Sequence, residues 1–175
     1  MAKAATARPL EAENRKVEPA LKLRFLSHGT LGSRDPDRSR EFYEEFLGVE
    51  VIRTSPVSLM IRLGGPHTIA VVRELKKGEQ DRLNHNGLDV ETQEEVDAAY
   101  RIVLEQKDKW QIKNISEPKL QHGTYSFFFS DLDDNWWEIL TNPKGGYSWL
   151  FEQGGDLQGK GHQDRNFARP GVKTS

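Results

Sequence analysis

The chain has 175 residues, no cysteine and a formal net charge of -2. This length gives room for one domain or two small fused modules, and the near-neutral charge offers no electrostatic footprint for nucleic acid or an anionic membrane. The lack of cysteine excludes disulfides, thiolate metal sites and a cysteine nucleophile, which leaves His, Asp and Glu as metal ligands.

Residues 1–20 are rich in Ala, Glu, Arg and Lys and have no apolar periodicity, so we interpret them as a flexible N-terminal tail. They lack the hydrophobic segment of a secretory signal. No apolar run in the chain approaches the roughly 20 residues of a membrane span, so we expect a cytoplasmic protein.

A first structured unit is predicted over residues 21–75. It opens with an alternating strand, LKLRFLSHGTL, and continues with a helix that Asp35 caps and Pro36 begins. Gly48 fits the left-handed end of that helix. Three strands are then expected, over 49–54, 57–63 and 67–75.

A second unit over residues 83–142 repeats this order. The strand LNHNGLDVE precedes a helix opened by a capping box of Thr92 and Glu95, and strands are expected over 110–116, 122–131 and 135–142. The sequence therefore predicts an α+β protein of two tandem βαβββ modules. Residues 143–175 are interpreted as a C-terminal extension that could act as a lid.

Three residues are candidate metal ligands. His28 and His85 fall on the first strand of each unit, and Glu138 lies on a strand among tryptophans, where a buried carboxylate needs a partner. Two imidazoles and one carboxylate form a facial triad that holds a divalent metal and leaves positions open for substrate or O₂. The alternatives are hydrogen-bonded structural histidines and an exposed edge position for Glu138.

Three segments resemble the vicinal oxygen chelate superfamily, which includes glyoxalase I, extradiol dioxygenases, and fosfomycin- and bleomycin-resistance proteins. These segments are SHGTLGSRDPDRSREFYEEFLGVEV, LNHNGLDVETQEEVDAAY and YSFFFSDLDDNWWEIL. The resemblance implies a curled mixed sheet around a metal cleft, with His28, His85 and Glu138 at the ligand positions. It also implies Fe(II) as the favoured metal, with Mn(II), Zn or Ni as alternatives, and a homodimer in which modules are sometimes exchanged.

Four further residues are candidates for the site. Thr30 should share the cavity face with His28 and aligns with a substrate-binding threonine of fosfomycin-resistance proteins, while Phe128 and Trp136 are expected to line the cavity. Phe128 stands where extradiol dioxygenases commonly carry a tyrosine, so that acid is missing. His122 could replace it as a catalytic acid or base, or could be a turn histidine beside Gly123.

Three functions remain open for a small-molecule substrate. The first is an Fe(II) dioxygenase for an aromatic, vicinally oxygenated compound, and the second is a redox-neutral lyase, isomerase or transferase. The third is a binding protein that sequesters a drug. The intact triad argues against the third, and we favour the dioxygenase over the redox-neutral enzyme.

Overall fold

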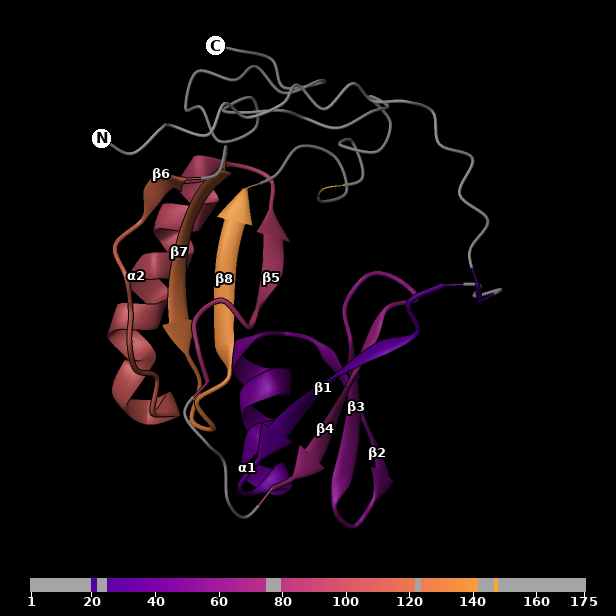
Figure 1. Ribbon diagram of the computed structural model, residues 1–175. Helices are drawn as coiled ribbons and strands as arrows, with labels where there is room; N and C mark the ends of the chain where they lie inside the picture. The colour runs from indigo at the N-terminus through magenta and orange to yellow at the C-terminus, as the bar shows by residue number, and fades with distance from the viewer. Residues whose placement is uncertain (1–19, 22–24, 75–79, 122–123, 142–146, 148–175) are drawn as a thin grey trace, which may run out of the picture.

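The strands form two separate four-stranded mixed sheets in the computed structural model, which describes residues 20–21, 25–74, 80–121, 124–141 and 147 (Figure 1). The first sheet has the order β1-β4-β3-β2, from strands β1 (His28–Ser33), β2 (Glu50–Ser55), β3 (Ser58–Arg62) and β4 (Thr68–Arg73). The second has the order β5-β8-β7-β6, from strands β5 (His85–Val90), β6 (Lys119–Gln121), β7 (Thr124–Ser130) and β8 (Trp136–Thr141). In each sheet, the strands that come first and last along the chain pair in parallel, β1 with β4 and β5 with β8. A helix follows β1 and another follows β5. The predicted α+β class with two βαβββ units is confirmed.

The helix of the first unit begins and ends where the sequence predicted. Asp35 accepts a hydrogen bond from the Asp37 amide at 3.1 Å, and Pro36 starts α1 (Pro36–Glu41). The helix continues as a π-helical turn, Phe42–Phe46. Gly48 follows with a φ of 68°, a backbone conformation that favours glycine because it has no Cβ.

The helix of the second unit, α2 (Gln93–Trp110), is longer than predicted. Its capping box is present, with the Glu95 amide 3.2 Å from Thr92 Oγ1 and the Thr92 amide 3.1 Å from Glu95 Oε2. The strand predicted over 110–116 is wrong. Trp110 stays helical because it continues the buried face of Val96 and Val103. Among the described residues, no helix is long and apolar enough to cross a membrane.

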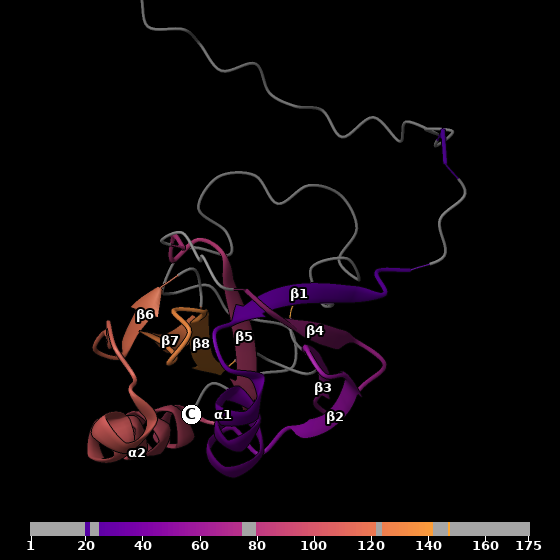
Figure 2. The same cartoon turned by 90° about the horizontal axis from the view of Figure 1, so that it is seen from below.

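The two units share one hydrophobic core. Phe42 and Tyr43, from the first unit, are fully buried against tryptophans of the second. The ring centroids of Phe42 and Trp110 are 6.0 Å apart, as are those of Tyr43 and Trp137. Figure 2 shows α1 near α2 on one side of the sheets. The two ring contacts therefore hold the first unit against the second.

The turn between β7 and β8 also joins the units. Asp133 Oδ1 accepts from the Arg34 amide at 2.7 Å, and Asp133 Oδ2 accepts from Ser39 Oγ at 2.5 Å. Asn135 Nδ2 donates to the Gly32 carbonyl at 3.1 Å. Within the turn itself, Asp131 Oδ1 accepts from the amides of Asp133 and Asn135, each at 2.9 Å, so the DLDDN sequence both forms the turn and joins the units. The predicted tail over 1–20 and extension over 143–175 lie outside the described residues, apart from Ala20 and Tyr147.

Candidate metal centre

Strand pairing in the second sheet brings His85 and Glu138 together. Gly87 lies opposite Glu138 across β5 and β8, and His85 is two residues from Gly87, so both side chains project from the same face. His85 Nε2 is 3.2 Å from Glu138 Oε2. Two of the three predicted ligands therefore meet within one unit.

The remaining polar atoms of this pair are already bound. The Arg82 carbonyl lies 2.7 Å from His85 Nδ1, and because a carbonyl can only accept, Nδ1 carries the hydrogen. Ser126 Oγ donates to Glu138 Oε1 at 2.6 Å and accepts from Gln121 Nε2 at 3.0 Å. Such outer contacts orient metal-binding imidazoles and carboxylates in proteins.

His85 Nε2 and Glu138 Oε2, which face each other, are placed so that both could coordinate one divalent cation. With the hydrogen of neutral His85 on Nδ1, the lone pair of Nε2 points at the carboxylate, so a proton or a metal ion must lie between them. Two ligand atoms at right angles around a metal, each about 2.1 Å from it, are about 3 Å apart. The 3.2 Å separation matches this spacing. Glu138 is only 6% exposed, which adds to the need for a cation.

The third predicted ligand, His28, lies on the first sheet. The alternation of β1 puts His28 and Thr30 on the exposed face of that sheet, opposite to the buried Leu31 and Ser33. His28 Nδ1 contacts Ser27 Oγ at 2.7 Å, which leaves Nε2 for another ligand. Within the residues that the structure describes, no three His, Asp or Glu side chains converge in a metal-binding group. The ligand set thus stays a prediction.

The remaining predicted site residues are Phe128, Trp136 and His122. Phe128 lies directly opposite Glu138 across β7 and β8, and its ring meets the His85 ring edge-on, with centroids 4.9 Å apart. Trp136 is on the same strand face as Glu138, and its Nε1 donates to the Gln80 carbonyl at 2.9 Å. His122 lies outside the described residues, so its predicted catalytic role stays a prediction.

A small pocket of about 210 Å³ opens over His85 and Glu138. Its walls include Phe128 and three residues that the sequence did not suggest, namely Arg82, Gln121 and Tyr147. Arg82 falls between the two predicted units, 21–75 and 83–142, although its position three residues before His85 was an available signal. Nothing local in the sequence indicated that Tyr147 would reach the pocket.

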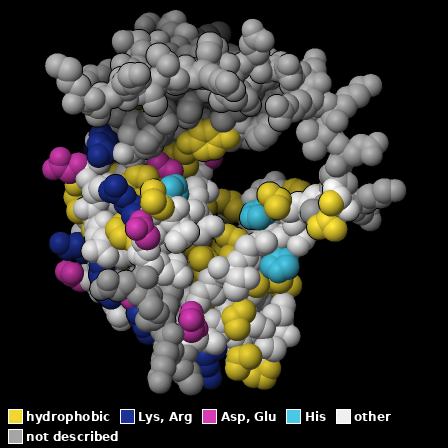
Figure 3. Space-filling view, viewed as in Figure 1, with side chains coloured by type: hydrophobic (Ala, Val, Ile, Leu, Met, Phe, Trp, Pro, Cys, Tyr) yellow, Lys and Arg dark blue, Asp and Glu magenta, His cyan; other side chains and the backbone are white. Residues whose placement is uncertain are grey.

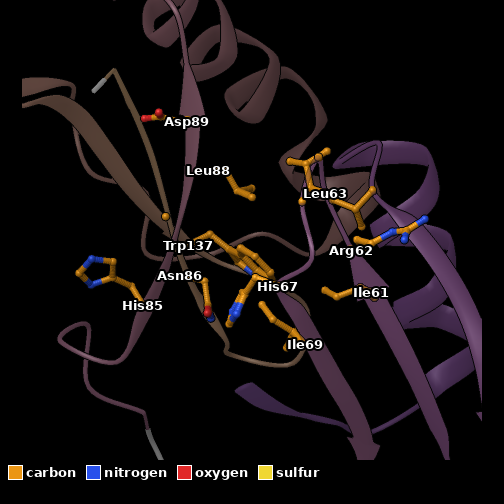
Figure 4. A pocket seen from close by; sticks show the side chains of 14 residues that line it. Ile61, Arg62, Leu63, His67, Ile69, His85, Asn86, Leu88, Asp89 and Trp137 are labelled. Atoms are coloured by element: carbon orange, nitrogen blue, oxygen red, sulfur yellow. The ribbon is translucent and has the colours of Figure 1, made fainter. Parts of the chain in front are cut away.

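A larger cavity of about 720 Å³ separates the two sheets, and Figure 3 shows it as a hollow with histidines on both walls. Its lining is mainly apolar, and His67 and Asn86 lie beside Trp137 (Figure 4). The His85 ring lies on the other side of β5 in the same view. His85 belongs to the lining of both the larger cavity and the small pocket, whereas Glu138 lines only the small pocket.

Several solved structures share this fold. A possible glyoxalase from Bacillus cereus is 21% identical with a TM-score of 0.56, and the match covers 67% of this chain and 99% of that one. A lactoylglutathione lyase from Agrobacterium tumefaciens is 15% identical with a TM-score of 0.53, over 69% and 95% of the two chains. A fosfomycin resistance protein from Listeria monocytogenes is 22% identical with a TM-score of 0.54, also over 69% and 95%.

A comparison with curated protein sequences found no match. The sequence does match the Glyoxalase/Bleomycin resistance protein/Dioxygenase superfamily over residues 25–139. This range contains all three predicted ligands and both βαβββ units apart from the last two residues of β8. The predicted membership is confirmed, and the chain belongs to this superfamily, the vicinal oxygen chelate proteins.

Proposed function

We propose that this protein is a metal-dependent enzyme that carries out a redox-neutral reaction on a small substrate with two adjacent oxygen atoms. The observation that carries the proposal is the placement of His85 Nε2 3.2 Å from Glu138 Oε2, with the other polar atom of each side chain already hydrogen-bonded. A divalent metal bound there would supply a Lewis acid that polarises a chelating oxygen and stabilises developing negative charge.

The residues around the pair support this role. The Ser126 hydroxyl holds Glu138 in one orientation, and the Arg82 carbonyl fixes the imidazole of His85 with Nε2 toward the carboxylate. Phe128 and Leu140 are 6% and 4% exposed and share the face of Glu138, so they limit water around the carboxylate. A buried carboxylate held in a fixed orientation beside an imidazole favours metal binding and electrostatic catalysis.

The third ligand is proposed to be His28 of a second copy in a homodimer. The face of the first sheet that carries His28 also exposes apolar side chains, with Ile52 62% and Val72 38% exposed. An open apolar face of this kind suits contact with another protein surface. If it covers the His85 and Glu138 face of the second copy, the facial triad is completed between chains.

Mixing two inactive variants tests this arrangement. His28→Ala and His85→Ala should each lose most metal binding, because each removes one ligand from every site. After the two proteins are mixed and refolded together, a heterodimer has one intact site, so about a quarter of wild-type metal binding should return. A site formed within one chain would show no recovery, since neither variant then holds a complete triad.

Two observations move the preference from oxygenase to redox-neutral chemistry. Phe128 occupies the strand position opposite Glu138 and places a hydrocarbon ring against His85, whereas ring cleavage would need a proton-donating side chain at this position. A lactoylglutathione lyase and a fosfomycin resistance protein also share the fold. We therefore propose Mn(II), Zn or Ni in place of Fe(II).

The second candidate is the Fe(II) dioxygenase, which the two-histidine, one-carboxylate ligand set favours. Metal analysis of anaerobically purified protein, followed by O₂ consumption with a panel of catechols, separates the two. Bound Mn, Zn or Ni without O₂ uptake supports the redox-neutral enzyme, whereas iron with substrate-dependent uptake supports the dioxygenase. A metal-free protein whose stability is unchanged by His85→Ala would contradict both enzymes and favour a drug-binding protein.

A further inference from the structure

We infer that Arg82 forms an anion-binding subsite beside the His85 and Glu138 pair, and that the substrate carries a carboxylate next to its two chelating oxygens. This inference rests on the proposed function, because it assigns the substrate class of the same site. It goes beyond that function by naming a group that recognises a part of the substrate away from the metal.

The placement of the guanidinium is the first observation. Arg82 lines the pocket of about 210 Å³ together with His85, Phe128 and Glu138. Its guanidinium carbon lies 5.2 Å from the centroid of the Phe128 ring, and that ring touches the His85 ring edge-on. Phe128 therefore contacts both the cation and the proposed metal-binding imidazole, and it holds the guanidinium by a cation–π contact.

The charge of Arg82 is the second observation. Several arginines of the first unit are paired with carboxylates, as Arg40 is with Glu44 and Arg62 is with Glu50. Across the described part of the chain, no acidic side chain forms an ion pair with Arg82, and Glu138 in the same pocket is directed to His85 and Ser126. Stacking on a ring face leaves the in-plane N–H groups of a guanidinium free, and their fork matches a carboxylate.

The backbone of Arg82 is the third observation. Its carbonyl accepts the hydrogen bond from His85 Nδ1 at 2.7 Å, so the cation and the metal ligand are held by one short segment. The subsite is thus fixed relative to the metal position. Tyr147 and Gln121 complete the polar lining. A compact ligand that chelates the metal at one end can place a carboxylate against Arg82 at the other.

A matched pair of probes tests this inference. Catechol and 3,4-dihydroxybenzoate share the same vicinal hydroxyls and differ by one carboxylate, so both can chelate but only the second can use Arg82. Dissociation constants are measured by calorimetry on the Mn(II)-loaded full-length protein without O₂. The proteins are wild type, Arg82→Gln, and Arg101→Gln as a control, since Arg101 is exposed on α2 and does not line this pocket.

Wild type and the Arg101→Gln control should bind the carboxylate probe about tenfold or more tightly than catechol, as expected for a charge-assisted contact. Arg82→Gln should remove this preference by weakening only the carboxylate probe, with Mn(II) content and catechol binding unchanged. The inference is overturned if wild type shows no preference, if the preference survives in Arg82→Gln, or if that variant weakens both probes equally. Failure of wild type to retain Mn(II) or bind either probe would instead overturn the proposed function, and the inference with it.

Discussion

The Ser126 hydroxyl donates a hydrogen bond to Oε1 of Glu138 over 2.6 Å, and both residues are buried on neighbouring strands. This hydrogen bond holds the buried carboxylate group of Glu138 in one orientation. Its second oxygen is therefore presented to His85, 3.2 Å away. This contact links the core of the second sheet to the candidate metal centre and leads to the first prediction.

Replacing Ser126 by alanine should weaken metal binding about 10-fold to 100-fold, because the variant leaves Glu138 unanchored and short of one hydrogen bond. Calorimetric titration with Mn(II) or Zn(II) measures this loss. Ser130→Ala is the matched control. Ser130 is also fully buried on β7, but its hydroxyl accepts from Asn114 and does not contact Glu138. Equal metal affinities in the two variants would contradict the orienting role of Ser126.

Asp133 should contribute strongly to the junction between the two units. Asp133→Ala removes the acceptor for the Arg34 amide and the Ser39 hydroxyl, and we expect a loss of about 2–4 kcal/mol in the free energy of unfolding. Urea denaturation monitored by tryptophan fluorescence measures it. Asp37→Ala, at a side chain that is 77% exposed, should change this free energy by less than about 1 kcal/mol. A similar effect of both variants would argue against the junction.

Asp134 should make stability depend on acid pH. Burial raises its pKa, but hydrogen bonds and charge from Arg34 and Lys113 outweigh that effect and lower the pKa below the ordinary value of 3.8. Because the pKa of Asp134 is lower in the folded state, its ionised carboxylate stabilises the protein at any pH above the ordinary pKa. This contribution is lost as the pH falls through the lowered pKa. Asp134 is 32% exposed, so the contribution should be at most about 1 kcal/mol.

The Asp134→Asn variant measures this contribution without disturbing the backbone. Asp134 has a φ of 62°, which asparagine tolerates well. The wild type should be more stable than the variant in urea at about pH 7, and the difference should shrink toward zero at about pH 2. A difference that stays constant between these two conditions would show that the ion pairs of Asp134 do not cause it.

The capping box of α2 gives the last prediction. Thr92→Ala removes the acceptor for the Glu95 amide and should lower the free energy of unfolding by about 1 kcal/mol. Thr92→Ser keeps a hydroxyl at the cap and should retain most of the wild-type stability. Thermal unfolding followed by far-UV circular dichroism compares the three proteins. If the serine variant falls as far as the alanine variant, the methyl group of Thr92 matters more than its hydrogen bond.

Short-range patterns predicted the element boundaries well where a local contact decides them. Asp35, Gly48 and the pair Thr92 and Glu95 act within a few residues of each helix end, so their effect can be read from the sequence. The end of α2 was different. The strand predicted over 110–116 was wrong because Trp110 continues the buried face of α2 and packs there against Phe42 from the other unit, a contact that local propensity does not contain.

The repeated βαβββ order and the strand faces that carry His85 and Glu138 could be predicted from the amino-acid sequence, because alternation along a strand fixes which side chains share a face. That these two residues meet depends on the register between β5 and β8, which the folded chain reveals, and His28 lies on a separate sheet. The fold also brought Arg82 and Tyr147 to the same pocket. Strand register and loop position depend on contacts between residues far apart in the chain, and no short motif specifies them.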